Sequence, residues 1–280
     1  MDPVNHKMGY ERPIEIADNI FWVGFHDQVS NFHCNPYLVI EGDQAVLIDA
    51  GSRPDFPVVM MKILQAGILP EQIVALIYHH VDPDLCGSLS NMVDICSNTQ
   101  LQVLSEPRNN TFISYYIERD KRALLKSIDE YGMFFHFAGR TFKFIKTPYA
   151  HDAGSFVTYD QKTKTLFSSD LFGSISNKWE LYTELEEECY TCEDYDRCIK
   201  RGKYCPLPDI IDFHKMLIPS GKALRIAMRA IGGLEIDRIA PQHGSIFHKK
   251  KDIDFIIGKL ASLKGVGIDA VKSSPAASGD

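Results

Sequence analysis

The sequence predicts a layered protein of the α/β or α+β class, because strand and helix signals follow one another along most of its 280 residues. Residues 73–80 form an almost continuous apolar run, which is typical of a strand buried on both faces of a sheet. Amphipathic segments lie between such runs and can cover the faces of a sheet. A hydrophobic share of 45% and a charged share of 24% are ordinary for a globular protein, so disorder, collagen and coiled coil are excluded for the chain as a whole.

Turn residues and apolar spacing predict the elements of the first half. Strands are indicated where β-rich runs are bounded by turns such as Asp18-Asn19 and Gly42-Asp43. Helices are indicated by apolar residues three and four apart, and Gly67 is a typical residue to end one. The expected elements are two short strands in 14–25, a hairpin in 36–51, a helix in 56–67, a strand in 73–80, a short helix in 88–98, a strand in 101–106 and a long amphipathic helix in 111–131.

The second half predicts more strands before it returns to helices. Four short segments rich in aromatic and β-branched residues predict strands in 134–139, 141–148, 155–160 and 164–170. Helical spacing follows in 219–234, a strand and loop in 236–244, and a last helix in 249–264. We expect one domain over 1–265, interrupted by an insertion at about 176–210, and a flexible tail over 266–280, where small and polar residues gather.

Charge and composition argue against nucleic-acid binding, membrane insertion and secretion. The formal net charge of −7 argues against a nucleic-acid partner, which needs a basic surface. No apolar run reaches the roughly 18 residues of a membrane helix, and the first residues lack the apolar core of a secretory signal. We therefore expect a cytoplasmic protein. Its cysteines, an odd number of 7, then do not predict a disulfide framework.

Candidate metal ligands lie at the ends of the expected strands. His80, Asp82 and Asp84 alternate in the loop after residues 73–80, so their side chains can converge on one point. Imidazole and carboxylate together suit iron and manganese as well as zinc. The aspartates would also suit caps of the following helix, so this spacing alone leaves a structural role open. Further candidates, each after a strand-like run, are His151, Asp170 and His243.

These residues lie in motifs that resemble the metallo-β-lactamase superfamily, and more closely the di-iron domain of flavodiiron proteins and the stand-alone oxygen-binding di-iron proteins. The segments TPYAHDAGSFVTY…LFSSDLFG and IDRIAPQHGSIF resemble the family at many positions besides the ligands, and NPYLVI…LIDAG resembles its N-terminal hairpin. The resemblance runs over about residues 35–247. It implies an αββα sandwich, with two mixed β-sheets at the centre and helices on the outer faces.

The resemblance also implies a ligand set for two irons. His80, Asp82, His151 and a bridging Asp170 would hold one iron, and Asp84, Asp170 and His243 would hold the other. The chain departs from the family pattern twice in the first metal loop. Asp82 stands where the family has Glu, so that carboxylate is one methylene shorter. Leu85 stands where the family has a His, so the second iron lacks one ligand.

Three further residues are candidates near this site. His79 and His33 are the nearest histidines that could complete the second iron. Asp49, in LIDAG, is expected to orient ligating histidines, because this position lies beside the metal loop in the superfamily.

Three functions remain open at this point. A carboxylate-rich site favours iron and a protein that binds dioxygen or nitric oxide, to sense it or to reduce it. The alternative is a two-metal hydrolase, such as a phosphodiesterase of a small nucleotide. The third is a binding module whose altered metal site is degenerate. The residues after His243 are too few for the flavodoxin domain of flavodiiron proteins. Reduction would therefore need an external flavoprotein or rubredoxin-like donor, a cluster bound by the cysteines of the insertion, or a homodimer that brings a donor within reach.

The insertion carries a second candidate metal site. Cys189, Cys192, Cys198 and Cys205 follow the spacing C-x2-C-x5-C-x6-C, and four thiolates suit zinc or an iron–sulfur cluster. A zinc-stapled loop and an electron-transferring cluster both remain open. The other cysteines are isolated in the sequence. Cys34 and Cys96 are expected to be small buried hydrophobic residues, and Cys86, inside the metal loop, an oxidation-sensitive thiol.

Overall fold

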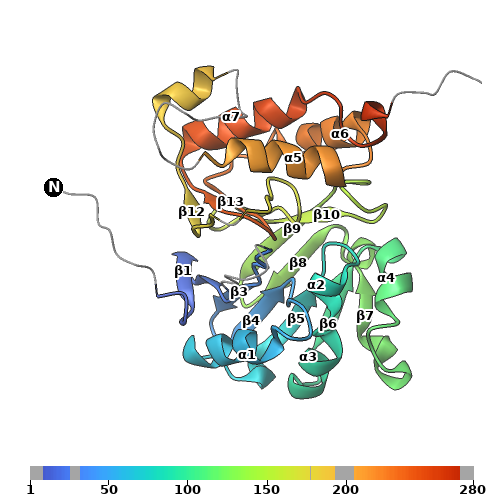
Figure 1. Cartoon of the computed structure of the whole chain (residues 1–280). Helices are drawn as coiled ribbons and strands as arrows, with labels where there is room; N and C mark the ends of the chain where they lie inside the picture. The colour runs from blue at the N-terminus through green and yellow to red at the C-terminus, as the bar shows by residue number, and fades with distance from the viewer. Residues whose placement is uncertain (1–8, 26–31, 177, 193–204, 272–280) are drawn as a thin grey trace, which may run out of the picture.

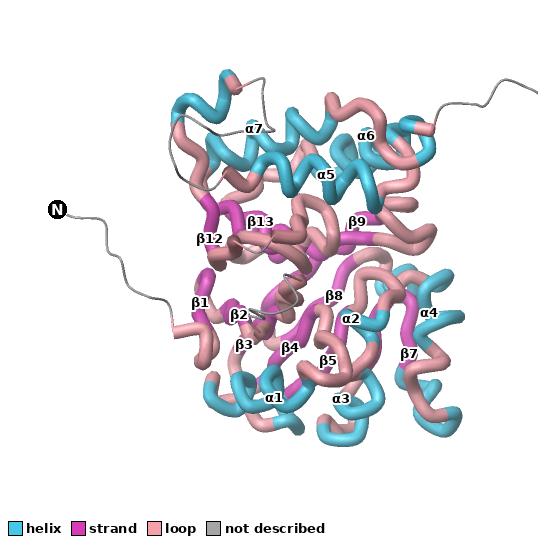
Figure 2. The backbone as a smooth tube through the Cα atoms, in the orientation of Figure 1, coloured by secondary structure: helices cyan, strands magenta, loops and turns pink. Residues whose placement is uncertain are grey.

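The computed structural model describes residues 9–25, 32–176, 178–192 and 205–271. Two seven-stranded sheets face each other at the centre, and helices cover the outer face of each (Figure 1). Figure 2 shows the same layers, with helices above and below the strands. This arrangement confirms the expected αββα sandwich. In the described part of the chain no helix combines the length and apolar character needed to cross a membrane.

The first sheet has the strand order β1-β2-β3-β4-β5-β6-β7. Its first four strands pair antiparallel as a meander, and β4 to β7 pair parallel. Helices cover this sheet because parallel neighbours need a crossover connection. Its strands are β1 (Ile14–Ala17), β2 (Ile20–Trp22), β3 (Tyr37–Glu41), β4 (Gln44–Ile48), β5 (Ile73–Ile77), β6 (Gln102–Ser105) and β7 (Leu125–Ser127). Its helices are α1 (Phe56–Gln65), α2 (Pro83–Cys86), α3 (Leu89–Ile95) and α4 (Pro107–Ile113).

The second sheet has the strand order β12-β14-β13-β11-β10-β9-β8. Three helices lie together on its outer face (Figure 1). Its strands are β8 (Phe134–Phe137), β9 (Arg140–Lys146), β10 (Phe156–Asp160), β11 (Thr165–Phe167), β12 (Tyr182–Thr183), β13 (Arg238–Ala240) and β14 (Ile246–Phe247). Its helices are α5 (Leu207–Leu217), α6 (Gly221–Ile231) and α7 (Lys250–Ala261).

Three apolar clusters hold the layers together. The central cluster packs side chains of both sheets against each other, among them Val39, Phe142 and Phe167. A second cluster packs α1 and α3 on the first sheet, and a third packs α5, α6 and α7 on the second sheet. Burial of these side chains is the main favourable contribution to folding. The loops at the rim of the sandwich are therefore held by strands that are fixed on both faces.

The expected long helix over residues 111–131 is wrong. The chain leaves α4 at Ile113, forms 3-10 turns at Arg119–Leu124 and Ile128–Tyr131, and places β7 between them. Leu125 and Ser127 of β7 pair with β6, so sheet pairing overrides a helical pattern that many charged residues had suggested.

The structure also adds elements that the sequence pattern did not indicate. Helix α5 begins at the end of the expected insertion. The two-residue strand β12, inside the insertion, pairs parallel with the two-residue strand β14, which follows β13. Residues 266–271 of the expected tail pack on the domain, since Val266 is buried and Ile268 donates its amide to the Pro219 carbonyl. Residues 193–204, including Cys198, and 272–280 lie outside the described residues.

Candidate metal centre

The predicted ligands lie together at one rim of the sandwich, in segments contributed by both sheets. Parallel and neighbouring strands end at this rim, so residues far apart in the chain meet there. His80 and Asp82 follow β5, Asp84 lies in α2, His151 lies between β9 and β10, Asp170 follows β11, and His243 follows β13.

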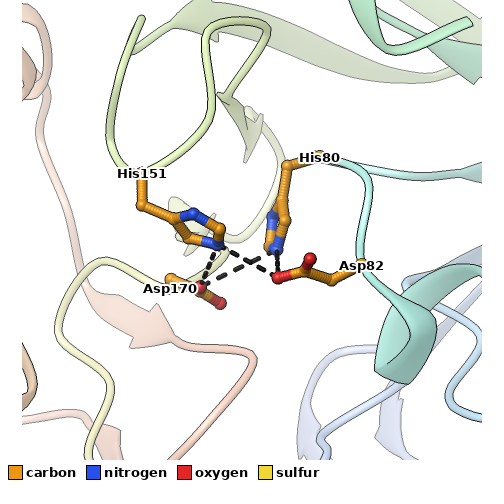
Figure 3. A group of neighbouring side chains, drawn as sticks. All are labelled: His80, Asp82, His151 and Asp170. Atoms are coloured by element: carbon orange, nitrogen blue, oxygen red, sulfur yellow. Dashed lines mark ion pairs between the residues drawn. The ribbon is translucent and has the colours of Figure 1, made fainter. Parts of the chain in front are cut away.

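The first group consists of His80, Asp82, His151 and Asp170 (Figure 3). His151 Nε2 lies 3.0 Å from Asp170 Oδ2 and 3.2 Å from Asp82 Oδ2. His80 Nε2 lies 3.4 Å from Asp82 Oδ2 and 3.7 Å from Asp170 Oδ2. The shorter carboxylate of Asp82 therefore reaches the other members of the group from its own loop.

The second group consists of Cys34, Asp84 and His243. His243 Nε2 lies 3.1 Å from Asp84 Oδ2, and the thiol of Cys34 lies 3.9 Å from the same oxygen. The expectation that Cys34 is a small buried hydrophobic residue is wrong, because Cys34 is only partly buried. Its Sγ lies with charged side chains, and its only sequence signal was its place next to the NPYLVI motif.

Asp170 joins the two groups. Its Oδ2 atom faces His151 and His80, whereas its Oδ1 atom lies 3.6 Å from His243 Nε2. One carboxylate thus offers one oxygen to each group, which is the arrangement that a bridge between two metal ions requires.

The electrostatics of the site couple its imidazoles to its carboxylates. Burial by itself lowers the pKa of His151, but Asp170 and Asp82 outweigh it and raise that pKa to about 10. The pKa values of His80 and His243 are also raised, because the neighbouring carboxylates outweigh the effect of burial there too. The same contacts hold the pKa of Asp82 and Asp170 well below the usual range, despite burial. The histidines of the metal-free site therefore bind protons, and a metal cation that binds there would displace them.

Buried atoms without hydrogen bonds indicate that this site suits a metal. Asp170 Oδ1 is buried and makes no hydrogen bond, and the buried Nε2 atoms of His80 and His151 face carboxylate oxygens in ion pairs without good hydrogen-bond geometry. A buried polar atom without a hydrogen-bond partner costs free energy, so each such atom in a native structure calls for an explanation. A cation among them would take up their lone pairs. The nitrogen and oxygen donors of the first group fit iron, manganese or zinc.

Hydrogen bonds at the far ring nitrogens set how two of the histidines point. His80 Nδ1 lies 2.9 Å from Ser169 Oγ, and His243 Nδ1 donates to the His33 carbonyl at 2.8 Å. In each ring this contact directs Nε2 toward the candidate ligands. Such outer contacts orient metal-binding imidazoles and fix their tautomer.

The remaining candidates take other places. His79 Nδ1 lies 2.5 Å from Asp49 Oδ2, and its Nε2 lies 2.9 Å from Thr158 Oγ1, so both ring nitrogens are engaged outside the two groups. Asp49 also accepts the His79 amide, which holds the end of β5 just before His80. The His33 ring stacks on Trp179 at 4.6 Å, and Leu85 is buried in the apolar cluster under the first sheet. Asp49 thus contacts His79 rather than a member of either group.

The NPYLVI motif and the IDRIAPQHGSIF motif meet at this rim. Asn35 donates its side-chain amide to the carbonyls of Pro241 and Gly244, and Tyr37 donates its hydroxyl to Pro241. The loop that carries His243 is therefore tied to the start of β3. Gly244 has a φ of +80°, and a Cβ there would lie 2.5 Å from Ser174 Oγ, so the position requires glycine.

Comparison with known families agrees with this geometry. The family model described as the ODP family beta lactamase matches residues 32–244. The chain belongs to this family. That assignment confirms the resemblance noted in the sequence, and the αββα sandwich is the fold of its structural neighbours.

Relatives of this ODP-family chain include longer proteins. An uncharacterized protein of Methanocaldococcus jannaschii is 29% identical over 88% of this chain and 59% of its own length. Diflavin flavoprotein A 1 of Synechocystis is 26% identical over 76% of this chain and 33% of its own length. The chain thus spans less than two thirds of the length of either relative. The solved structure of the peroxy diiron species of chemotaxis sensor ODP has a TM-score of 0.73 at 22% identity, covering 92% of this chain and 97% of that one. At that identity the likeness shows a shared fold.

Helix α5 supports the Asp170 loop of this ODP-family chain through His214. The Phe172 amide donates to His214 Nε2 at 2.9 Å, and His214 Nδ1 donates to the Ile210 carbonyl at 2.7 Å. Burial lowers the pKa of His214 to about 4, because the charged imidazolium would lose its hydration there.

This histidine predicts a pH dependence of stability. Its pKa is lower when folded than when unfolded, so its share of stability is full above about pH 6.5 and is lost as the pH falls toward 4. The loss reaches about 3 kcal/mol by pH 4. His214→Gln keeps an acceptor for the Phe172 amide without a titrating group. Urea unfolding of metal-free protein should therefore show a smaller drop between pH 7 and 4 in the variant, and equal drops in both proteins would contradict this role.

Proposed function

We propose that the chain is a non-haem di-iron protein that binds dioxygen or nitric oxide. The observation that carries the proposal is Asp170, whose two carboxylate oxygens face different groups of candidate ligands. His80, Asp82 and His151 would hold the first iron with Asp170. Asp84 and His243 would hold the second iron with the other oxygen of Asp170. Bound iron would supply the electrons that a diatomic gas needs for binding.

The residues around the centre support a small ligand with restricted access. His80, Asp170 and His243 are buried, whereas the Asp82 side chain is 38% exposed and the His151 side chain 18% exposed. A small ligand would therefore enter on the side of the first group. Phe32 stacks on the His243 ring at 4.1 Å and so covers one face of that candidate ligand.

The donor set favours redox chemistry over hydrolysis. Three aspartates and three histidines make the family-implied ligand set rich in carboxylate, and hard oxygen donors suit iron better than they suit zinc. Relatives agree with this direction. One solved neighbour is named a peroxy diiron species of a chemotaxis sensor, and a relative in Pectobacterium atrosepticum is named an anaerobic nitric oxide reductase flavorubredoxin. We propose that an external flavoprotein or rubredoxin-like chain supplies electrons when the gas is reduced.

Nitric oxide gives a direct test of this function. The full chain is loaded with ferrous iron under nitrogen and titrated with nitric oxide, with visible and electron paramagnetic resonance spectra recorded at each step. Saturable iron–nitrosyl signals are the expected result. The absence of such signals, together with metal-dependent hydrolysis of bis-p-nitrophenyl phosphate by the zinc or manganese form, would instead support the two-metal hydrolase.

We also propose the four-cysteine site of the insertion, on the strength of its spacing. Cys189 and Cys205 pack against the same apolar cluster under α7, which brings the two ends of the insertion to one side of the domain. Cys198 lies outside the described residues, and the two ligand groups found in the described chain include none of the other three.

Replacing Cys192 by serine tests this second site. We expect the variant to lose the zinc, or the iron and acid-labile sulfide, of the cysteine site and to keep the iron of the His/Asp centre. Metal and sulfide analysis of both proteins measures the difference. Unchanged metal and sulfide content in the variant would refute a metal site at these cysteines.

A further inference from the structure

Cys34 lies where the second metal position lacks a ligand. Leu85 stands where the family has a histidine, and its side chain is buried in the apolar cluster away from the site. In the described part of the chain, the side chains that gather around His243 Nε2 are Asp84, Asp170 and Cys34. The ligand atoms of Cys34, Asp84 and His243 all lie within 4.8 Å of one another, which is the spread expected of donors around one ion.

The backbone holds Cys34 at this point from both sides. The His33 carbonyl accepts from His243 Nδ1, and the Asn35 amide donates to the Gln242 carbonyl at 2.9 Å. The Asn35 side chain makes two more bonds to the same loop, so the residues flanking Cys34 are both fixed to the segment that carries His243. The Cys34 backbone therefore cannot leave the site without breaking this set of bonds.

A second observation independently indicates a ligand position here. Asp170 Oδ1 is buried, makes no hydrogen bond, and lies 3.6 Å from His243 Nε2. It thus points an unmet lone pair at the position around which Cys34, Asp84 and His243 gather. A cation there would satisfy it, and a bound metal would deprotonate a neighbouring thiol.

We propose that Cys34 is a thiolate ligand of the second metal position, alongside Asp84, His243 and Asp170. This inference rests on the proposed di-metal centre and gives its two positions different chemistry. The first position would have only nitrogen and oxygen donors, whereas the second would also have sulfur, a soft and strongly donating ligand. The thiolate would take up the coordination that Leu85 does not supply.

Cobalt substitution tests the ligand without relying on activity. Cobalt(II) bound by thiolate absorbs in the near ultraviolet by charge transfer, whereas nitrogen and oxygen ligands do not give this band. The metal-free full chain is titrated with cobalt(II), as are the variants Cys34→Ser and Cys34→Ala. Cys96→Ser is the control, because Cys96 is also buried but lies in the helical layer outside both groups. Subtracting each variant's spectrum from that of the wild type removes any signal from the cysteines of the insertion.

We expect both Cys34 variants to lose a thiolate band that the Cys96 variant keeps. One of the two cobalt ions should also bind at least about 10-fold more weakly, since loss of even an outer contact costs 10- to 100-fold. If the Cys34 variants give the same spectra and cobalt affinities as the wild type and the Cys96 variant, Cys34 is not a ligand. The two-metal centre itself would not be contradicted by that result. If Asp170→Asn also binds two ions as the wild type does, the proposed centre itself fails rather than the role of Cys34.

Discussion

Replacing Asp170 by asparagine is expected to remove metal from both positions of the centre at once. Asp170 is buried, and each of its oxygens faces a different group. An amide carries no charge and has only one oxygen to offer, so neither group keeps a charged ligand from this position and the bridge between them is lost. We expect bound iron to fall from about two atoms per chain to near zero, measured by metal analysis after desalting.

The pattern across variants makes this prediction specific. His151→Gln removes a member of the first group only, so the second position should keep its metal. Asp254→Asn is the control for the aspartate change, since Asp254 pairs with Lys250 on the exposed face of α7. Circular dichroism checks that each variant is folded. Full metal retention by Asp170→Asn would contradict the bridging role, and loss by Asp254→Asn would show that the assay reports general damage.

Replacing Arg140 by methionine is expected to destabilise the fold by about 3–5 kcal/mol. Arg140 is buried and makes two bonds to the buried carboxylate of Asp160, at 3.0 Å and 2.8 Å. Its guanidinium also donates to the carbonyls of Asp18 and Ile40, so it links β9 of the second sheet to the first sheet. Despite burial, these bonds hold the pKa of Asp160 below its usual value. Without the arginine, a buried carboxylate loses its counter-charge.

Chemical denaturation measures this loss, and a double variant separates its causes. Arg140→Met combined with Asp160→Leu removes both charges, so it should be more stable than Arg140→Met alone. Lys250→Met breaks an exposed pair and should change stability little. A free energy of unfolding unchanged by Arg140→Met would show that the pair does not hold the sheets together.

The sequence was most informative where turns and motifs act locally. The alternation of strands and helices predicted most elements, and the motifs around His80, His151, Asp170 and His243 predicted residues that the structure brings together. These residues could be found because each follows a strand that ends at the same rim.

What the sequence did not predict depends on contacts between distant segments. Cys34 joins the site because residues 33–37 bond to residues 241–244, and no local pattern indicates that contact. The helix expected over residues 111–131 gave way to β7 because β6 was available as a partner. Helix α5, which carries His214, was not predicted, because the cysteine spacing just before it led its first residues to be assigned to the insertion.

The most direct test of the central claim is metal and acid-labile sulfide analysis of the anaerobically purified full chain, with visible spectra before and after oxygen is added. We expect about two iron atoms per chain beyond those matched by sulfide, and a new visible absorption that forms with oxygen. Zinc or manganese in place of iron, with a spectrum that oxygen does not change, would contradict the di-iron function.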